Sequence, residues 1–199
     1  LQPECCIIGP PGSIKGRICE ILAQAKDEGG LGMKHISIGE AQRHAVRKNE
    51  ALGPKVKEAM QQKYNKEQEA KKNGQKADDS DADLNAQVLA WMLKEEAKEG
   101  WILEGYPRTK LEAEAMKSHG VHLEKLIVVD IGDDALVALA TGRRMDLQTN
   151  TMYHIEGLGG WAPPPDDPQV KERLVQRKDD AEGKVRERLQ AYRETYKDV

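Results

Sequence analysis

The sequence contains no phenylalanine, and its aromatic residues are limited to three tryptophans and five tyrosines. We therefore expect a core built mostly from aliphatic side chains. No apolar run approaches the roughly 20 residues that a membrane-spanning helix needs. The N-terminus also lacks the charged, apolar and small-residue succession of a secretory signal. These absences predict no membrane partner, and the 199 residues suffice for one sizeable domain.

Cysteine is scarce, and neither sign of charge dominates. Cys5, Cys6 and Cys19 form no C-x-x-C pair, and two of them are adjacent inside an apolar run. This pattern favours buried, reduced thiols in a cytoplasmic protein over disulfides or zinc ligands. The net charge of −3 excludes a global attraction to nucleic acid, so phosphate recognition requires a local cluster of basic side chains.

Short apolar runs alternate with longer helical patterns along the chain. The strand-like runs are residues 4–8, 35–37, 101–104 and 125–131. The helical patterns cover residues 13–26, 39–49, 54 into the sixties, 85–99, 133–141 and 168 to the end. This alternation predicts a three-layer α/β fold around a parallel sheet. The run KLIVVDI at residues 125–131 is continuously apolar, so we expect it to be a central strand covered on both faces.

Residues 63–83 differ from the rest of the chain because they are almost free of apolar side chains. The stretch carries five lysines and then four aspartates. It is predicted to be a solvated helix end followed by a flexible, exposed loop. An interaction tail is the alternative.

The clearest chemical motif is GPPGSIKGR at residues 9–17. A strand, a glycine-rich loop, a lysine and a helix start together form an anion nest, in which backbone N–H groups and the helix dipole favour phosphate. The usual P-loop has glycine where Ile14 stands, so the strict pattern is not met. A simple Gly/Pro turn between a strand and a helix is the alternative.

Arginines follow at the same predicted edge of the sheet. In ILEGYPRT at residues 102–109, Glu104 ends a strand and Arg108 follows a turn. Ligands of open α/β folds bind at the carboxyl ends of the strands, so Arg108 is expected there unless it is an ordinary surface residue. Arg177 and Arg188 are eleven residues apart, close to three helical turns, which places both on one predicted helix face. Converging guanidinium groups suit phosphate oxygens, whereas a charged helix face is commonly only solvated.

Taken in order, these motifs resemble those of the adenylate kinases, which are nucleoside monophosphate kinases, from Glu4 to about Tyr192. Residues 9–17 resemble the phosphate loop, SIGEAQR at 37–43 the monophosphate motif, and LEGYPR at 103–108 the Asp-Gly-Tyr-Pro-Arg signature. GRR at 142–144, YH at 153–154, PPPDD at 163–167 and RKDD at 177–180 resemble parts of the family's longer lid. The resemblance implies a P-loop nucleoside triphosphate hydrolase-type sheet, with core residues 1–36, 84–142 and 176–199. It further implies a monophosphate-binding helical region at 37–83 and a lid at about 143–178, here called the lid segment.

By this resemblance, the chain would transfer a phosphoryl group from ATP to AMP, giving ADP. The residues that would bind the ATP phosphates are Gly9, Gly12, Ser13, Lys15, Gly16 and Arg17. Those that would bind AMP are Ser37, Arg43, Gly105, Arg108 and Glu112. Those that would surround the transferring group are Lys15, Arg108, Arg143, Arg177 and Arg188. Glu104 would orient the water shell of Mg²⁺, and no zinc is expected because the lid segment has no cysteine.

The sequence departs from the family pattern at the same places. Ile14 replaces a loop glycine, Arg17 a small hydroxyl residue, and Glu104 the usual aspartate. Glu112 stands where a glutamine reads the AMP base, and Leu139 where many members stack an arginine on the ATP base. The family also has a fifth strand and a helix that would follow Val199.

Two interpretations of function therefore stay open. One is an active but impaired phosphotransferase, since all the implied lysine and arginine positions are retained. The other is a weak or inactive nucleotide-binding scaffold within a larger assembly, with other protein chains as partners. A ciliary or flagellar axoneme is the location that the resemblance suggests for such a domain, and the start at Leu1 instead of methionine favours a piece of a longer protein. The base preference of the monophosphate site stays open as well.

Overall fold

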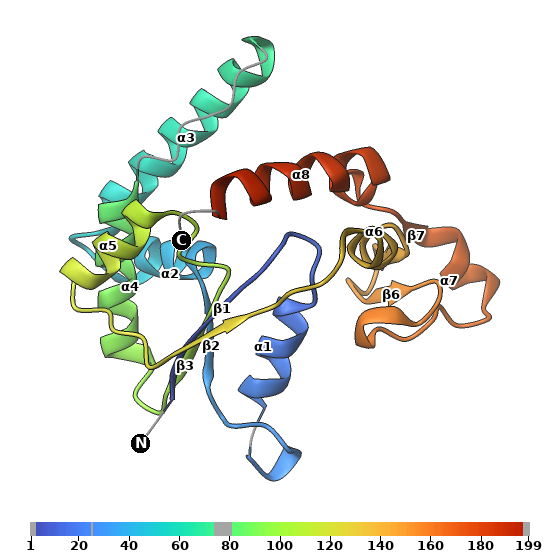
Figure 1. Cartoon of the computed structure of the whole chain (residues 1–199), viewed down its shortest axis with the longest axis horizontal. Helices are drawn as coiled ribbons and strands as arrows, with labels where there is room; N and C mark the ends of the chain where they lie inside the picture. The colour runs from blue at the N-terminus through green and yellow to red at the C-terminus, as the bar shows by residue number, and fades with distance from the viewer. Residues whose placement is uncertain (1–2, 25, 74–80, 197–199) are drawn as a thin grey trace.

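A four-stranded parallel sheet forms the centre of the molecule (Figure 1). The computed structural model describes residues 3–24, 26–73 and 81–196. The strands are β1 (Glu4–Ile8), β2 (Lys34–Ser37), β3 (Trp101–Glu104) and β4 (Lys125–Val128), in the order β2-β3-β1-β4. All four predicted strand regions therefore form strands. Helices pack on both faces of this sheet, which confirms the predicted three-layer α/β fold.

Eight helices accompany the sheet within the described residues. They are α1 (Lys15–Ala23), α2 (Ile38–Lys48), α3 (Gly53–Asn73), α4 (Ala82–Glu96), α5 (Lys110–Ser118), α6 (Asp133–Thr141), α7 (Pro168–Arg173) and α8 (Glu182–Thr195). Three short 3-10 turns are η1 (Lys26–Glu28), η2 (Leu158–Gly160) and η3 (Lys178–Asp180). No helix among the described residues combines the length and the apolar character needed to cross a membrane.

Side chains alternate across the sheet and divide its core in two. Ile102 of β3 packs with Ile7 of β1 and Cys19 of α1 on one face. The next residue, Leu103, packs with Leu89 and Met92 of α4 on the opposite face. This period of two is that of a pleated strand. The core is mostly aliphatic, as the absence of phenylalanine predicts, and α1 supplies Cys19, Ile18 and Leu22 to the core on its face of the sheet.

The lid segment contains a second, small antiparallel sheet. Its strands are β5 (Arg143–Asp146), β6 (Met152–His154) and β7 (Leu174–Val175), in the order β6-β5-β7. Asp146 is buried within it and accepts a hydrogen bond of 2.8 Å from Arg173 Nε. The Arg173 guanidinium lowers the pKa of Asp146 to about 2, so the buried carboxylate stays charged and fastens α7 to β5.

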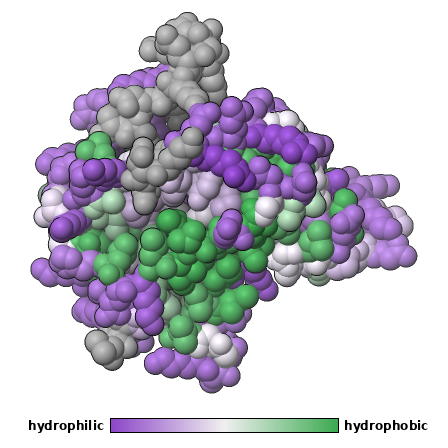
Figure 2. Space-filling model, in the orientation of Figure 1, coloured by the Kyte–Doolittle hydropathy of each residue, from purple (hydrophilic) through white to green (hydrophobic). Residues whose placement is uncertain are grey.

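The expected central position of residues 125–131 is wrong. Strand β4 ends at Val128 and lies at the edge of the sheet, paired only with β1 among the described strands. Leu126 and Val128 are 54% and 59% exposed. In Figure 2, an apolar area covers the middle of the face across which β4 runs in Figure 1. A continuous apolar run indicates that both faces of a strand are apolar, but it does not determine the order of the strands.

The charged stretch at residues 63–83 is more helical than expected. Helix α3 continues to Asn73 and projects from the body of the molecule (Figure 1), while α4 begins at Ala82 rather than Asn85. Lysine, glutamate, glutamine and alanine are strong helix formers, so a lack of apolar side chains does not end the helix. Tyr64 is exposed, as predicted for this stretch. The remaining part of the predicted loop, residues 74–80, lies outside the described residues.

Candidate functional site

The loop between β1 and α1 has the backbone shape of an anion-binding nest. Gly9 has φ +154°, and a Cβ atom added there would lie 2.7 Å from the Val129 carbonyl oxygen, so only glycine fits. Gly12 has φ +82°, also in the region that favours glycine. Helix α1 then starts at Lys15, and its N-cap residue, Ile14, gives the helix no side-chain hydrogen bond. The first N–H groups of α1 are thus left for a ligand.

Lys15 is folded back onto this loop. Its Nζ donates hydrogen bonds to Gly9 O at 2.9 Å, Pro10 O at 2.6 Å and Ser13 Oγ at 2.9 Å. Burial is the main cause that lowers the pKa of Lys15 to about 8, against the opposing attraction of Glu104. A phosphate that enters the loop must draw the ammonium group away from these oxygens, or share it with them.

Arg108 and Arg188 lie close enough to Lys15 for their charges to lower its pKa further. Both are exposed: Arg108 Nε donates to Gly105 O at 3.0 Å, and Arg188 Nη1 donates to Asp179 O at 3.1 Å. The structure therefore brings the charges of two predicted arginines near Lys15 of the phosphate loop, although one lies in the middle of the chain and the other near its end.

The remaining arginines lie elsewhere. Arg143, on β5, forms an ion pair with the buried carboxylate of Asp180, and its Cζ lies 5.7 Å from the centre of a Trp161 ring. Arg177 is exposed in the connection before η3, so it does not belong to α8. The predicted shared helix face of Arg177 and Arg188 is therefore wrong, because a turn interrupts the helical spacing.

Arg43 lies on α2 and lines a cavity between α2 and α3. The cavity has a volume of about 370 Å³. Its lining consists of Arg43, Val46, Arg47, Lys57, Met60 and Gln61. Ser37 caps the start of α2, where its Oγ accepts a hydrogen bond of 3.3 Å from the backbone N–H of Glu40. The predicted monophosphate motif thus places its serine at a helix start and its arginine at a cavity with basic and apolar walls.

Glu112, which was expected to contact the AMP base, has a structural role at the start of α5. The side chain is buried, and its Oε2 accepts a hydrogen bond of 2.6 Å from the backbone N–H of Arg108. In return, Thr109 Oγ1 caps the N–H of Glu112 at 3.2 Å. The sequence Thr-x-x-Glu at residues 109–112 is a capping-box pattern, so this signal was available in the sequence. The carboxylate therefore fixes the turn that presents Arg108.

Glu104 lies at the carboxyl end of β3, beside the start of α1. A Cβ atom added to Gly16 would lie 3.2 Å from Glu104 Oε1, so the glycine admits this carboxylate. Glu104 Oε2 lies 2.8 Å from His35 Nε2. Their hydrogen bond is the main cause that lowers the pKa of Glu104 and raises that of His35. A charged carboxylate at the phosphate loop fits the predicted role toward Mg²⁺, which prefers oxygen ligands and retains several waters.

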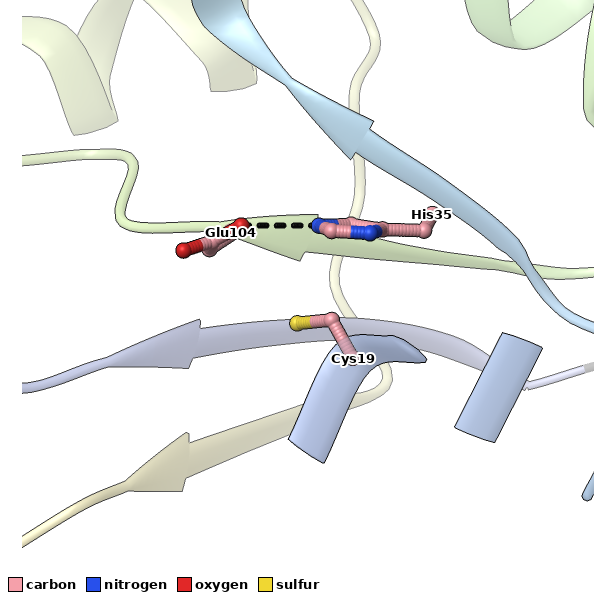
Figure 3. A group of neighbouring side chains, drawn as sticks. All are labelled: Cys19, His35 and Glu104. Carbon is pink, nitrogen blue, oxygen red and sulfur yellow. Dashed lines mark hydrogen bonds and ion pairs between the residues drawn. The ribbon is translucent and has the colours of Figure 1, made fainter. Parts of the chain in front are cut away.

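His35 and Cys19 are neighbours of Glu104 that the sequence motifs did not identify. The three residues come from β2, α1 and β3, and their potential ligand atoms lie within 4.8 Å of one another (Figure 3). Ile36 and Leu103 pack on the opposite face of the sheet. Because side chains alternate along a strand, their neighbours His35 and Glu104 lie on the α1 side. This alternation, applied to the predicted strands, could have placed His35 and Glu104 on the same face.

Arg17 extends toward the lid segment. Its Nη1 pairs with Glu20 Oε2 at 3.0 Å, and a Cβ atom added to Gly160 would lie 3.7 Å from Arg17 Cγ. Leu139 similarly borders the lid segment, since a Cβ atom added to Gly159 would lie 3.0 Å from its Cδ2. Two positions that depart from the family pattern thus contact the same turn of the lid segment.

Comparison with known proteins agrees with this arrangement. A family sequence model described as adenylate kinase matches residues 7–199. A probable adenylate kinase 2, chloroplastic, from Oryza sativa subsp. japonica is 32% identical over 192 residues, which cover 94% of this chain and 57% of the rice protein. An adenylate kinase, chloroplastic, from Zea mays is 30% identical over 192 residues, which cover 94% of this chain and 74% of the maize protein. The chain therefore spans little more than half the length of the rice relative, and it belongs to the adenylate kinase family.

Proposed function

We propose that this chain catalyses reversible phosphoryl transfer from ATP to AMP, giving two ADP. The proposal rests on Lys15, which is hydrogen-bonded to the glycine-rich loop and feels the charges of Arg108 and Arg188, and on the Glu104 carboxylate beside Gly16 of the same loop. Phosphoryl transfer is catalysed mainly by positioning and charge neutralisation, which is what several fixed cations around a phosphate nest supply.

Each region of the site then has one task. The loop N–H groups and Lys15 bind the terminal phosphates of ATP. Arg43 binds the AMP phosphate at the mouth of the α2–α3 cavity, and Arg108 faces the same phosphate from the turn after β3. Glu104 would hold the water shell of a Mg²⁺ ion bound with ATP, and that ion would neutralise part of the phosphate charge. The transferred group leaves the β-phosphate oxygen and forms a bond to an oxygen of AMP.

Residues 143–178 act as a lid in this proposal. Arg143 and Arg177 reach the transferring group only after the lid segment closes, because Arg143 is held by Asp180 and Arg177 faces solvent in the present arrangement. Closure excludes water and so prevents transfer of the phosphoryl group to water instead of AMP.

The proposed enzyme is slower than a typical family member. Ile14 puts a β-branched side chain into a loop that must approach phosphate closely, and Arg17 is paired with Glu20. A phosphate displaced by about 1 Å can cost on the order of 100-fold in rate. Binding of ATP depends on the nest and on Lys15, so Ile14 and Arg17 reduce its affinity less than they reduce the rate of the chemical step.

Measured ADP formation from Mg²⁺, ATP and AMP tests the proposal. Lys15→Met should abolish turnover, whereas Lys117→Met, which removes an exposed lysine on α5, should not. The double variant Ile14→Gly with Arg17→Thr should raise kcat more than it raises ATP affinity. Turnover by the unchanged chain at typical kinase rates would contradict the impairment.

A nucleotide-binding scaffold is the second candidate, and the three hydrogen bonds that already occupy Lys15 Nζ favour it. Binding of ATP or ADP without turnover, even in the double variant, would support this role. A cytoplasmic or axonemal location and partner chains in a larger assembly stay predictions. Both relatives carry chloroplastic names, which lend the axonemal location no support.

A further inference from the structure

Three side chains of different elements meet under the start of α1. Cys19 comes from α1, His35 from β2 and Glu104 from β3, and Figure 3 shows the three side chains gathered in one place. Their potential ligand atoms lie within 4.8 Å of one another. Thiolate, imidazole and carboxylate together form a donor set that zinc accepts and that magnesium, which prefers oxygen alone, does not.

The spacing is close to that of a tetrahedral metal site. Zinc bonds of about 2.0 to 2.3 Å place neighbouring ligand atoms roughly 3.3 to 3.8 Å apart. His35 Nε2 and Glu104 Oε2 are now 2.8 Å apart because they share a hydrogen bond. A cation would replace the shared proton, and the distance between these two atoms would then increase by less than about 1 Å. The Cys19 sulfur would move toward them by a similar amount.

Access and charge also permit a cation here. Cys19 is fully buried, but the side chains of His35 and Glu104 are 27% and 29% exposed, so an ion can enter from their side and keep a water as fourth ligand. Burial raises the pKa of the Cys19 thiol to about 12, so binding must release its proton. Besides His35, the positive charge of Lys15 acts on Glu104.

We propose that Cys19, His35 and Glu104 form a binding site for a thiophilic divalent cation such as Zn²⁺. Occupation of the site draws Glu104 away from the phosphate loop and thereby inhibits the Mg²⁺-dependent reaction. The inhibition rests on the proposed function, whereas the binding does not. The site is separate from the lid segment, and it departs from our expectations that the chain takes no zinc and that its cysteines are not zinc ligands.

Cobalt binding tests the site directly, because a thiolate bound to Co²⁺ absorbs in the near ultraviolet and a four-coordinate ion has intense visible bands. Titration of the full chain with Co²⁺ should give both signals at one equivalent, and Zn²⁺ should remove them. Cys19→Ala should abolish the ultraviolet band, and His35→Gln should weaken binding by at least about 10-fold. Cys5→Ala is the matched control, because Cys5 is also a buried cysteine of the α1 face but lies outside the cluster.

The outcomes separate the two parts of the proposal. The site would be refuted if the unchanged chain shows no ultraviolet band. It would also be refuted if Cys19→Ala, with an unchanged circular dichroism spectrum, shows a band of equal strength. His35 and Glu104 would then be an ordinary hydrogen-bonded pair beside a core cysteine. The second measurement is ADP formation, followed by chromatography, with and without Zn²⁺ in excess Mg²⁺. Equal inhibition of Cys19→Ala and the unchanged chain would refute the coupling to Glu104. If the chain has no turnover at all, the cobalt spectrum still decides the binding.

Discussion

At the scale of single residues, Lys15 is the most consequential group, because the ammonium that is hydrogen-bonded to the loop is also the one that we propose binds phosphate. It is held by three oxygen atoms of its own loop, and burial lowers its pKa to about 8. A phosphate ligand therefore stabilises the charged form of a side chain that is partly neutral at mildly alkaline pH.

We predict that ATP affinity falls as the pH rises through about 8, because Lys15 loses its proton there. Binding near that pH should also take up a proton, since bound phosphate raises the pKa of Lys15 again. Calorimetric titrations between pH 7 and 9.5, in buffers with different ionisation enthalpies, measure both effects. Lys15→Arg, which stays charged, should lose this dependence, and an unchanged affinity across the range would contradict the role of Lys15.

Folding stability should change in the opposite direction. The pKa of Lys15 in the folded chain lies below its ordinary value of 10.5, so the unfolded chain binds more protons between the two values. The contribution of Lys15 to the free energy of unfolding therefore rises as the pH increases from about 8 toward 10.5. Ligand binding and fold stability thus place opposite demands on this residue.

The start of α5 illustrates what a helix terminus does for the site. Glu112→Ala should lower the free energy of unfolding by about 1 to 3 kcal/mol, because the backbone N–H of Arg108 loses its buried acceptor. Thr109→Ala, which removes only the cap, should cost about 1 kcal/mol. Urea unfolding measures both values. Glu112→Gln retains an acceptor oxygen, so a loss as large as that of the alanine variant would argue against this account.

Gly142, at the entrance to the lid segment, is closely packed against a buried histidine, and this packing allows a prediction about stability. A Cβ atom added to Gly142 would lie 2.2 Å from His154 Nε2, and that ring is buried and lies 3.1 Å from the Ala138 carbonyl oxygen. Gly142→Ala should therefore destabilise the fold by about 1 to 3 kcal/mol through overpacking. Gly183→Ala on α8 is the matched control, because nothing lies within 4 Å of its added Cβ atom. This control should be neutral or slightly stabilising, and equal effects of the two variants would contradict the prediction.

At the scale of the whole molecule, β2 and β4 are the two outer strands of the central sheet among the described strands, and the β4 edge is the apolar one. Strand β4 presents the exposed Leu126 and Val128 there. Apolar edge strands pair with other chains, so we predict self-association at high protein concentration. Val128→Lys should reduce it, as measured by light scattering, whereas Val46→Lys, an exposed valine on α2, should not. A concentration-independent mass for the unchanged chain would refute the prediction.

Local sequence patterns predicted the strands and helices of this molecule, but not how these elements are arranged relative to one another. The runs around Cys6, His35, Ile102 and Val128 identified every strand of the central sheet, because apolar runs and glycine-rich turns are local signals. The outer position of β4 depends on strand order, which no local pattern contains.

The candidate site divides in the same way. The sequence predicted a glycine-rich loop that contains Lys15 between a strand and a helix, and in the structure the charges of Arg108 and Arg188 act on that lysine. The pairing of Arg143 with Asp180 spans 37 positions, and that of His35 with Glu104 spans 69. Contacts across such separations arise from the packing of elements, so the sequence motifs did not reveal them.

The position of Trp161 has an optical consequence. The chain has only three tryptophans, and they lie in different surroundings: Trp101 is buried in the sheet, Trp91 lies beside His44, and Trp161 lies beside Arg143 in the lid segment. Indole emission depends on solvent exposure and on nearby charge. Replacing Trp91 and Trp101 by phenylalanine would leave a single indole, which absorbs at longer wavelengths than the five tyrosines and can be excited apart from them. The colour and lifetime of its emission would report the state of residues 143–178 without any added dye.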